Sequence, residues 1–558
     1  MTTTTRPITS SYDEVPYPST SHQFTHPDHL ATAAVLLGQS PAPVEHCRVL
    51  ELGSAGGGNI IPMALELPES EFVGIDASSV QIAEGQAAIA AVGAKNVTLK
   101  HLNIMDVDAD LGQFDYIIAH GIFSWVPEAV RDKILAVCKQ NLAPNGVAYI
   151  SYNVYPGWHM LGTVREMMLY HTRNVVEPQM RIAQARAVLD FLTESMLAAS
   201  EVGNGSLTKA YASFLKSERE HVVASTDSYV YHEELEEVND PLYFYQFAEW
   251  AARHGLQYLC ESNLSDVFLN DFPPQVTDTL LKMSHDLVEL EQYVDFLRNQ
   301  TFRKTLLVHQ GAPISRQLRP DRVMNLYVAS MARPASAEPD IRSISVEKFT
   351  SGDSVTLATD HPVTKAAMVC LEKLWPQMVP FDTLMTMAYA RLNQDRPNGD
   401  ALVEPDAARR AQDALVLSAN LLKGFAYSGR LVELHVYAPR FATEISEYPV
   451  ASPWARFVAQ SSNEVTNMCH LRLELKGLGQ FLVSHLDGTL NRAALVEGLA
   501  KSLLVGALEL KPQKPSGQDE GQQSESKPIT DIEQARKIVS EELDETLRAL
   551  ARAALLVA

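Results

Sequence analysis

The sequence predicts an α/β protein, with a Rossmann-like doubly wound sheet followed by mainly helical accessory domains. Three observations predict this fold. Short apolar runs alternate with helical patterns over residues of about 45–155, which is typical of βαβ units. These runs are continuous in Val, Ile and Leu, so the strands should be buried on both faces of a parallel sheet. After Gly157 helical periodicity replaces the alternation.

The expected strands follow one another along the first 160 residues. The stretches between them, such as 82–93 and 126–142, have the spacing of amphipathic helices. We expect strands at 47–52, 71–78, 96–104, 114–121 and 146–155.

The rest of the chain divides by its patterning. The apolar run 256–261 is suited to complete the first sheet, which makes residues 163–225 a helical insertion, whereas 278–309 is expected to be helical throughout. The C-terminal helix should pack on the last domain through one apolar face, made of Val539, Leu543, Leu547 and Leu550. The predicted domains are 1–162, the insertion 163–225, a middle domain 226–350, and a helical domain 351–558 with a flexible polar segment at 511–530.

The composition argues against several classes of function. The net charge is -22 and no basic run interrupts it, so we expect no nucleic-acid partner. No apolar stretch approaches the roughly 18 residues that cross a bilayer, so membrane insertion is not expected. The N-terminus has no apolar signal region, and the five cysteines are scattered. We therefore expect a cytoplasmic protein with reduced thiols and no metal site.

The clearest sign of a ligand site is the segment Val49–Ala64, VLELGSAGGGNIIPMA. A buried strand ends near Glu51, four glycines follow between positions 53 and 58, and a helix begins near Asn59. Glycines let the backbone turn tightly and approach a ligand without an intervening Cβ. By itself, such a turn suits a dinucleotide, another nucleotide or no ligand.

Two acidic residues narrow the choice of ligand. Asp76 ends the second strand about 20 residues after the turn, where a carboxylate can accept both hydroxyls of a ribose. Glu51 precedes the turn and would repel the pyrophosphate of a dinucleotide, but it suits the ammonium group of an amino acid. This pair favours S-adenosylmethionine over NAD.

In these motifs the sequence resembles the class I S-adenosylmethionine-dependent methyltransferases. ELGSAGGG stands where that class has its (D/E)xGxGxG turn, and GID ends the second strand. Ala55 replaces the usual second glycine, and Asn103 stands where an aspartate commonly faces the adenine amino group. Asn103 is either such an acceptor or a simple turn residue. The cofactor contacts that the resemblance implies are Tyr12, Glu51, Gly53, Ser54, Gly56, Asp76, Ala77, Asn103, Ile104 and His120.

A narrower resemblance is to methyltransferases with a regulatory domain, and among them to the rickettsial-type protein-lysine methyltransferases of outer-membrane protein. The segments that carry it are SYDEVPYPS (11–19), THPDHLAT (25–32), FDYIIAHGIFSWVP (114–127), YNVYPGW (152–158), QYVDFLRNQTFRKTLLVH (292–309) and HLDGTLNR (485–492). The resemblance covers nearly the whole chain. It implies a methyltransferase domain over 1–162, a dimerising helical insertion, a regulatory middle domain and a winged-helix-like C-terminal domain.

Several residues are positioned for the chemistry of methyl transfer. The segment with Tyr12 and Tyr17 is suited to fold over the cofactor as a lid. His120, which follows the fourth strand, is an acid or base by one interpretation and a structural histidine by the other. The segment after the fifth strand should form a polar and aromatic mouth that attracts a cation, made of Tyr152, Asn153, Tyr155 and Trp158.

We therefore predict a cytoplasmic, homodimeric methyltransferase that binds S-adenosylmethionine and acts on lysine side chains of a protein acceptor. A small-molecule N- or O-methyltransferase and a non-catalytic cofactor-binding scaffold are the alternatives. An open acidic groove would favour the protein acceptor, and a closed apolar pocket would favour the small molecule. The region beyond Ser351 is expected to dock the acceptor and to contribute little to cofactor affinity.

Overall fold

The computed structural model describes Val15 and residues 19–202, 205–269, 272–352, 355–394, 406–427, 431–505 and 531–557. Tyr12, Tyr17 and the segment 511–530 lie outside these residues.

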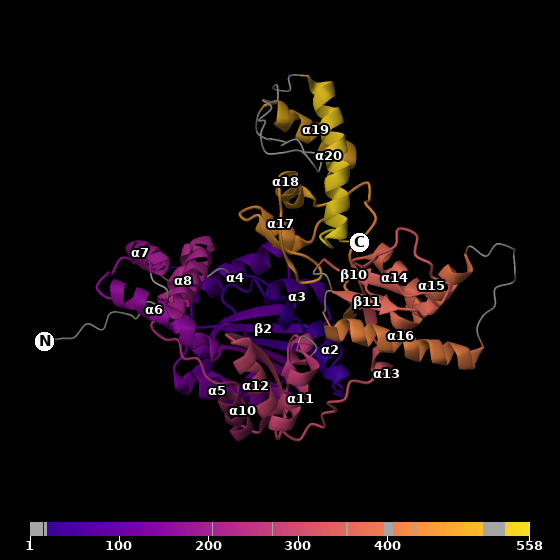
Figure 1. Cartoon of the computed structure of the whole chain (residues 1–558). Helices are drawn as coiled ribbons and strands as arrows, with labels where there is room; N and C mark the ends of the chain where they lie inside the picture. The colour runs from indigo at the N-terminus through magenta and orange to yellow at the C-terminus, as the bar shows by residue number, and fades with distance from the viewer. Residues whose placement is uncertain are drawn as a thin grey trace.

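A seven-stranded mixed sheet forms the centre of the molecule, in the order β3-β2-β1-β4-β5-β7-β6 (Figure 1). The first five strands are parallel, and β7 runs antiparallel to both of its neighbours. The side chains of Val49 and Leu50 in β1 are fully buried on opposite faces, as the continuous apolar run predicted. The strands are β1 (Arg48–Leu52), β2 (Glu71–Asp76), β3 (Val97–His101), β4 (Phe114–Ala119), β5 (Leu142–Asn153), β6 (Leu256–Glu261) and β7 (Phe302–His309).

Helices cover both faces of this sheet. One core cluster joins the sheet to α2, α3 and α4, and the other joins it to α5 and α10. The predicted doubly wound α/β fold is therefore confirmed. The helices of this layer arrangement are α2 (Pro27–Leu36), α3 (Ile60–Glu66), α4 (Ser79–Val92), α5 (Glu128–Asn141), α10 (Phe244–Arg253), α11 (Pro274–Met283) and α12 (Leu287–Arg298).

Three long helices that follow β5 in the chain form the group at the left of Figure 1. They are α6 (Gly157–Thr172), α7 (Pro178–Val202) and α8 (Ser206–Ala224), followed by the short α9 (Asp227–Tyr229) and the π-helical turn η6 (Val230–Glu234). Their apolar faces share a small core of their own, in which Met168, Leu189 and Leu215 are buried. We call α6 to η6 the helical insertion.

The expectation of a continuous helix over 278–309 is wrong at residues 284–286, which separate α11 from α12, and in its last part. Helix α12 ends at Arg298 because Asn299 adopts a left-handed conformation with φ 49°, which asparagine tolerates better than most residues. The chain then enters β7, where Leu306 and Leu307 are fully buried. The run 256–261 does complete the sheet, as β6, so residues beyond the insertion supply two strands of the first domain.

The region after β7 contains two small sheets besides its helices. The predicted division between residues 350 and 351 falls inside the hairpin of β10 and β11, whose strands complete each other's backbone hydrogen bonds, so no boundary lies there. Asp28 on α2 fixes the region to the first domain, through a 2.6 Å contact with His435. Its elements are α13 (Pro320–Val323), β8 (Tyr327–Ala329), β9 (Arg333–Pro334), β10 (Glu347–Thr350), β11 (Thr356–Thr359), α14 (Pro362–Leu374), β12 (Val379–Pro380), α15 (Phe381–Asn393), α16 (Ala407–Tyr427) and β13 (Glu433–His435).

The last part of the chain projects above the body of the molecule in Figure 1. The apolar face of its final helix, including Val539, Leu543 and Leu547, is buried against this domain, which confirms the predicted packing. Its elements are α17 (Pro453–Ala459), β14 (Glu464–Thr466), β15 (Arg472–Glu474), α18 (Leu478–His485), α19 (Arg492–Leu504) and α20 (Ile532–Arg552).

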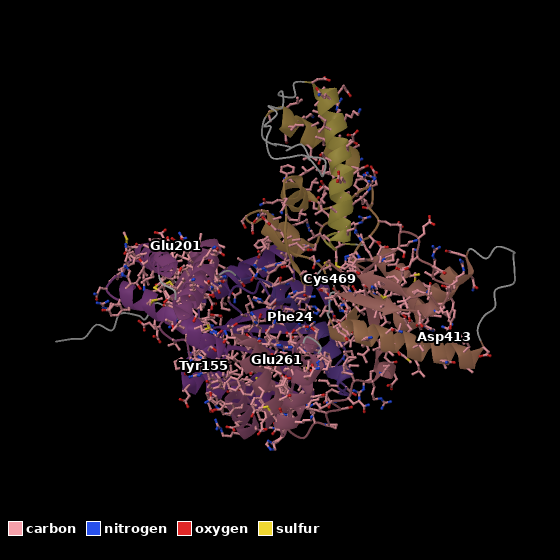
Figure 2. The ribbon with its side chains drawn as sticks, in the orientation of Figure 1. Phe24, Tyr155, Glu201, Glu261, Asp413 and Cys469 are labelled. Carbon is pink, nitrogen blue, oxygen red and sulfur yellow. The ribbon has the colours of Figure 1, made fainter. Side chains whose placement is uncertain are left out.

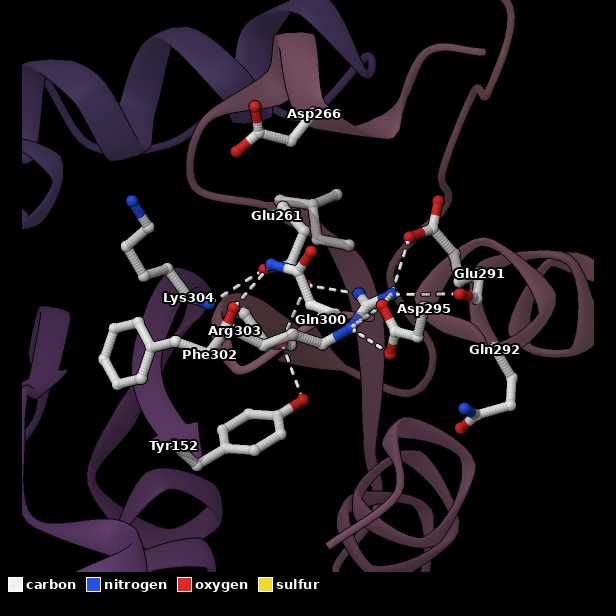
Figure 3. Close-up of polar contacts among 12 residues, drawn as sticks. Tyr152, Glu261, Asp266, Glu291, Gln292, Asp295, Gln300, Phe302, Arg303 and Lys304 are labelled. Carbon is white, nitrogen blue, oxygen red and sulfur yellow. Dashed lines mark hydrogen bonds and ion pairs between the residues drawn. The ribbon is translucent and has the colours of Figure 1, made fainter. Parts of the chain in front are cut away.

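A buried charged cluster joins β6, β7 and α12 (Figure 3). The guanidinium of Arg303 is 3% exposed and bonds three carboxylates, those of Glu261 at 2.8 Å, Glu291 at 3.0 Å and Asp295 at 2.8 Å. It also lies 3.9 Å from the centre of the Phe244 ring. Buried charges are stable only when they are paired and hydrogen-bonded, so the three segments depend on this one cation.

We expect Arg303→Met to destabilise the protein strongly, although the methionine fills a similar volume. Three carboxyl groups would lose their cation in the interior, and breaking a buried ion pair costs about 3–5 kcal/mol. Thermal unfolding followed by circular dichroism measures the change. Arg319→Met is the control, because Arg319 pairs with Asp321 on the surface and its loss should change the midpoint little. Equal midpoints for the two variants would contradict the structural role of the cluster.

Candidate functional site

A cavity of about 840 Å³ opens at the carboxyl ends of the parallel strands, where ligands of open α/β sheets bind. One end is bounded by the turn after β1 and by the ends of β2 and β3, and the other end by the helical insertion. The predicted cofactor residues that line it are Glu51, Gly53, Ser54, Asp76, Ala77, Asn103, Ile104 and His120.

The glycine-rich turn has a conformation that few residues can adopt. Gly53 has φ 72°, and a Cβ at this position would lie 2.6 Å from Cγ2 of Ile122. Ala55, at the position where the class usually has glycine, also adopts a left-handed φ of 47°. This conformation costs a non-glycine residue about 1–2 kcal/mol. Gly56 does not line the cavity, but lies beneath Ser19, whose Cβ would be 3.6 Å from a Cβ at position 56.

Asp76 holds the turn through its carboxylate. One oxygen accepts the N–H of Ala55 at 2.9 Å, and the other accepts the N–H of Ser78 at 2.8 Å. Each oxygen can accept a further hydrogen bond. The carboxylate therefore offsets the strain at Ala55 and still has acceptor capacity toward the cavity.

Glu51 is a carboxyl group buried at the cavity wall and 4% exposed. Its Oε1 accepts a 2.6 Å hydrogen bond from Nδ2 of Asn59, whereas its Oε2 has no partner among the described residues. Burial, countered by this hydrogen bond and reinforced by Asp76, raises the pKa of Glu51 to about 8. A buried acceptor without a partner is costly, and a cationic donor in the cavity would satisfy it.

Asn103 is a turn residue that also lines the cavity. Its Oδ1 accepts the N–H of Met105 at 2.9 Å and so caps a short 3₁₀ turn, and the side chain also lines the cavity. Ile104 lies beside it at the wall, where an apolar side chain can contact a flat aromatic ring.

His120 is neutral in this site. Burial, reinforced by His22 and Lys304, holds its pKa well below 6.5. Its Nδ1 lies 2.9 Å from the hydroxyl of Tyr149 and 3.2 Å from that of Ser151. Burial raises the pKa of Tyr149, so its hydroxyl keeps its proton and can either donate to Nδ1 or accept from it. The neutral ring of His120 therefore carries one N–H donor and one acceptor nitrogen.

The expected polar and aromatic mouth is only partly present. Side chains alternate along β5, so Tyr152 points away from the cavity and its buried ring stacks on Phe247 at 4.0 Å. The expectation that Tyr152 takes part in the chemistry is therefore wrong. Tyr155 stacks on His159 instead of lining the cavity. Asn153 and Trp158 do line it.

The far end of the cavity contains three glutamates that the sequence did not single out. The glutamates there are Glu218 of α8 and Glu233 and Glu234 of η6, and the rings of Trp125 and Trp158 meet edge to face at 6.3 Å. π-helical turns are rare in proteins, and those that occur are frequently found at functional sites. The acidic stretch HEELEE (232–237) is the only sequence signal that could have pointed to it.

The roof over the glycine-rich turn comes from residues that precede α2. Ser19 crosses the turn so closely that a Cβ on Gly58 would lie 2.0 Å from its carbonyl oxygen, and its Oγ accepts the N–H of Gly58. His22 lines the cavity and its ring packs against that of His120, tilted by 37° with 3.8 Å between the ring centres. The predicted lid residues Tyr12 and Tyr17 lie outside the described residues.

Two kinds of feature are absent from the described part of the chain. There, no group of three or more His, Cys, Asp or Glu side chains is arranged to hold a metal ion. No helix in the same ranges combines the length and apolar character that a membrane crossing requires.

Three family profiles match successive parts of the chain. Residues 50–148 match a methyltransferase domain, 226–309 a predicted methyltransferase regulatory domain, and 447–555 the PKMT C-terminal winged helix domain. The regulatory profile thus includes β6 and β7, which belong to the central sheet.

Relatives match over most of the chain. An uncharacterised protein of Rickettsia prowazekii (strain Madrid E) is 35% identical over 506 residues, which span 89% of this chain and 87% of the relative. A second protein of that organism is 41% identical over 249 residues, 45% of this chain and 96% of the relative. The solved structure of PKMT2 from Rickettsia typhi in complex with AdoHcy has a TM-score of 0.80 at 29% identity, covering 97% of this chain and 100% of that one. The chain therefore belongs to the class I S-adenosylmethionine-dependent methyltransferases that carry a regulatory domain and a PKMT C-terminal winged helix domain.

Proposed function

We propose that this methyltransferase acts on the lysine Nε of a protein acceptor. The observation that carries the proposal is the chemistry of the far wall of the cavity, where three glutamates and two tryptophans surround the space opposite the cofactor turn. Carboxylates and aromatic faces both attract an ammonium group. A wall of this kind fits a lysine better than it fits an apolar small molecule. The members of the PKMT family methylate protein lysines, which supports the same choice.

We assign the opposite end of the cavity to the cofactor. The free oxygen of Glu51 suits the ammonium of the methionine group, and the carboxylate of Asp76 suits the two ribose hydroxyls. Asn103 and Ile104 suit the adenine. The neutral ring of His120, which lines the cavity, can form a hydrogen bond with either substrate. These assignments fit the unpartnered buried acceptor and the glycine-lined turn.

The acceptor end must supply a neutral amine, because a protonated lysine has no lone pair to attack with. S-adenosylmethionine supplies a methyl group on a positively charged sulfur, and transfer forms the N–C bond as the C–S bond breaks. Glu234 is suited to take the proton from the ammonium, because burial and the neighbouring Glu233 and Glu218, opposed by Arg165, raise its pKa to about 7. We therefore assign Glu234 as the base.

We also infer a homodimer. Met180 and Phe191 on α7 are 52% and 66% exposed, and they lie eleven residues apart, so they share one face of the helix. Large exposed apolar side chains on one face support an interface between copies. A cytoplasmic location is likewise our inference, and the five free cysteines support it.

Glu51→Gln and Asp76→Asn should each weaken S-adenosylmethionine binding by about 10–150-fold, since each removes a charge-assisted contact of about 1.5–3 kcal/mol. Calorimetric titration measures the dissociation constants. Glu69→Gln is the control, because Glu69 is exposed in the turn before β2. Unchanged affinity in both folded variants would overturn the assignment.

The same titration should depend on pH in the wild type. The raised pKa of Glu51 means that the free protein holds a proton there below pH 8. Pairing with an ammonium requires the carboxylate, so binding should release that proton, and affinity should rise with pH up to about 8. Glu51→Gln should abolish the proton release.

Methyl-labelled S-adenosylmethionine added to a cell lysate should transfer its label to protein, and mainly to lysine. Amino-acid analysis of the labelled protein identifies the acceptor residue. Label confined to small molecules would favour a natural-product N- or O-methyltransferase, and binding without any transfer would favour a non-catalytic scaffold.

In this assay Glu234→Gln should lower kcat by about 100-fold or more, which is the usual contribution of a general base, and leave cofactor affinity unchanged. Wild-type activity should rise with pH through about 7, because Glu234 becomes a carboxylate there, and the variant should lose that dependence. Glu201→Gln is the matched control, since Glu201 is exposed near the end of α7, away from the cavity lining (Figure 2). Full activity of Glu234→Gln would exclude the base.

Light scattering should find a dimer for the wild type and a monomer for Phe191→Lys, because a charge would be buried in the interface. Leu415→Lys alters a similarly exposed apolar residue on α16 and should leave the dimer intact. A monomeric wild type would refute the inference.

A further inference from the structure

A loop of the winged helix domain reaches the cofactor end of the cavity. It joins β14 to β15, and Figure 2 shows Cys469, in this loop, where the domain meets the body of the molecule. Asn467 holds the loop in shape, because its Oδ1 accepts the N–H groups of Cys469 and Leu471 and its Nδ2 donates to the carbonyl of Ala553. His470 at its tip is 2% exposed.

The side chain of Asn59 connects this loop to Glu51. Its Oδ1 accepts two hydrogen bonds of 2.9 Å, one from the backbone N–H of His22 and one from Nε2 of His470. Its Nδ2 donates to Oε1 of Glu51 at 2.6 Å and to Oγ1 of Thr25 at 3.0 Å. The backbone N–H can only donate, so the amide orientation is determined and Nδ2 must face Glu51.

His470 acts as a donor in this network. Burial, reinforced by His26 and His22, holds its pKa well below 6.5, so the ring is neutral. Its Nδ1 has no partner among the described residues, whereas Nε2 faces an acceptor, so the hydrogen lies on Nε2. The backbone of His470 has φ 58°, a conformation that a non-glycine residue adopts only when its surroundings impose it.

We propose that His470 is a positioning residue for the methionine end of the cofactor, which acts through Asn59 to hold Glu51 in its binding orientation. The inference rests on the proposed role of Glu51. A second contact supports the placement of the loop, because the hydroxyls of Thr466 and Ser21 lie 2.9 Å apart and are buried. The winged helix domain thereby completes the cofactor site.

This role changes the expectation for the region beyond Ser351. A direct, buried hydrogen bond from residue 470 to the cofactor turn means that the C-terminal region contributes to cofactor affinity as well as to any acceptor docking. We therefore expect His470 to increase the affinity only of ligands that carry the amino-acid group of methionine.

The test compares two ligands on two variants by calorimetry of the full chain. S-adenosylhomocysteine carries the amino-acid group, and 5′-methylthioadenosine lacks it. His470→Asn suits the left-handed backbone, but its amide is too short to reach Asn59, whereas His470→Gln restores the reach. His470→Asn should weaken S-adenosylhomocysteine binding by about 3–10-fold, the loss of one hydrogen bond, and leave methylthioadenosine binding unchanged. His470→Gln should restore the wild-type affinity for both.

Equal losses for both ligands, or no loss for either, would overturn the positioning role, because a merely structural histidine does not distinguish them. Glu51→Gln tests the underlying assignment separately. If it weakens both ligands equally or neither, the proposed function of Glu51 fails. If Glu51→Gln weakens only the binding of S-adenosylhomocysteine, while His470→Asn weakens both ligands equally or neither, only the inference about His470 fails. Thr466→Val removes the neighbouring contact with Ser21 and should not alter the selectivity.

Discussion

A buried carboxyl group at the end of β1 is the constraint on which the cofactor site depends. Glu51 is removed from water, and burial of a carboxyl group is costly unless hydrogen bonds compensate. Asn59 supplies one such bond, and the remaining oxygen of this cavity-lining side chain has no partner among the described residues. The same burial that raises the pKa of Glu51 makes a cationic ligand the natural partner for its free oxygen. The turn, its roof and the winged helix loop are all arranged around this group.

The two ends of the cavity are built on different supports. The cofactor end rests on strand ends and a glycine-rich turn, whose backbone is fixed by the sheet and by Asp76. The end that we assign to the acceptor rests on the helical insertion, where Glu218 and Glu234 come from a helix and from a π-helical turn. Rigid strand ends suit a ligand common to the whole class, and an inserted element can vary to suit the acceptor.

Long-range polar contacts join distant parts of the chain. Asn59 joins the roof before α2 to a loop more than 400 residues later. Arg303 also connects separate segments, because its ion pairs join β7 to β6 and to α12. Phe302, which follows the bend at Asn299 and precedes Arg303, lines the cavity, so the charged cluster also fixes part of the wall.

The sequence by itself determined the doubly wound sheet, the glycine turn and the two acidic residues at the ends of β1 and β2, because these are local patterns of period and spacing. It could not separate Tyr152 from Asn153, since alternation assigns faces only once the register of β5 is known. It also extended the helix through β7, because the left-handed conformation of Asn299 that ends α12 has no periodic signal in the sequence. The tertiary structure alone brought Glu234 and His470 to the cavity and its network, since contacts between distant segments leave no periodic trace in a sequence.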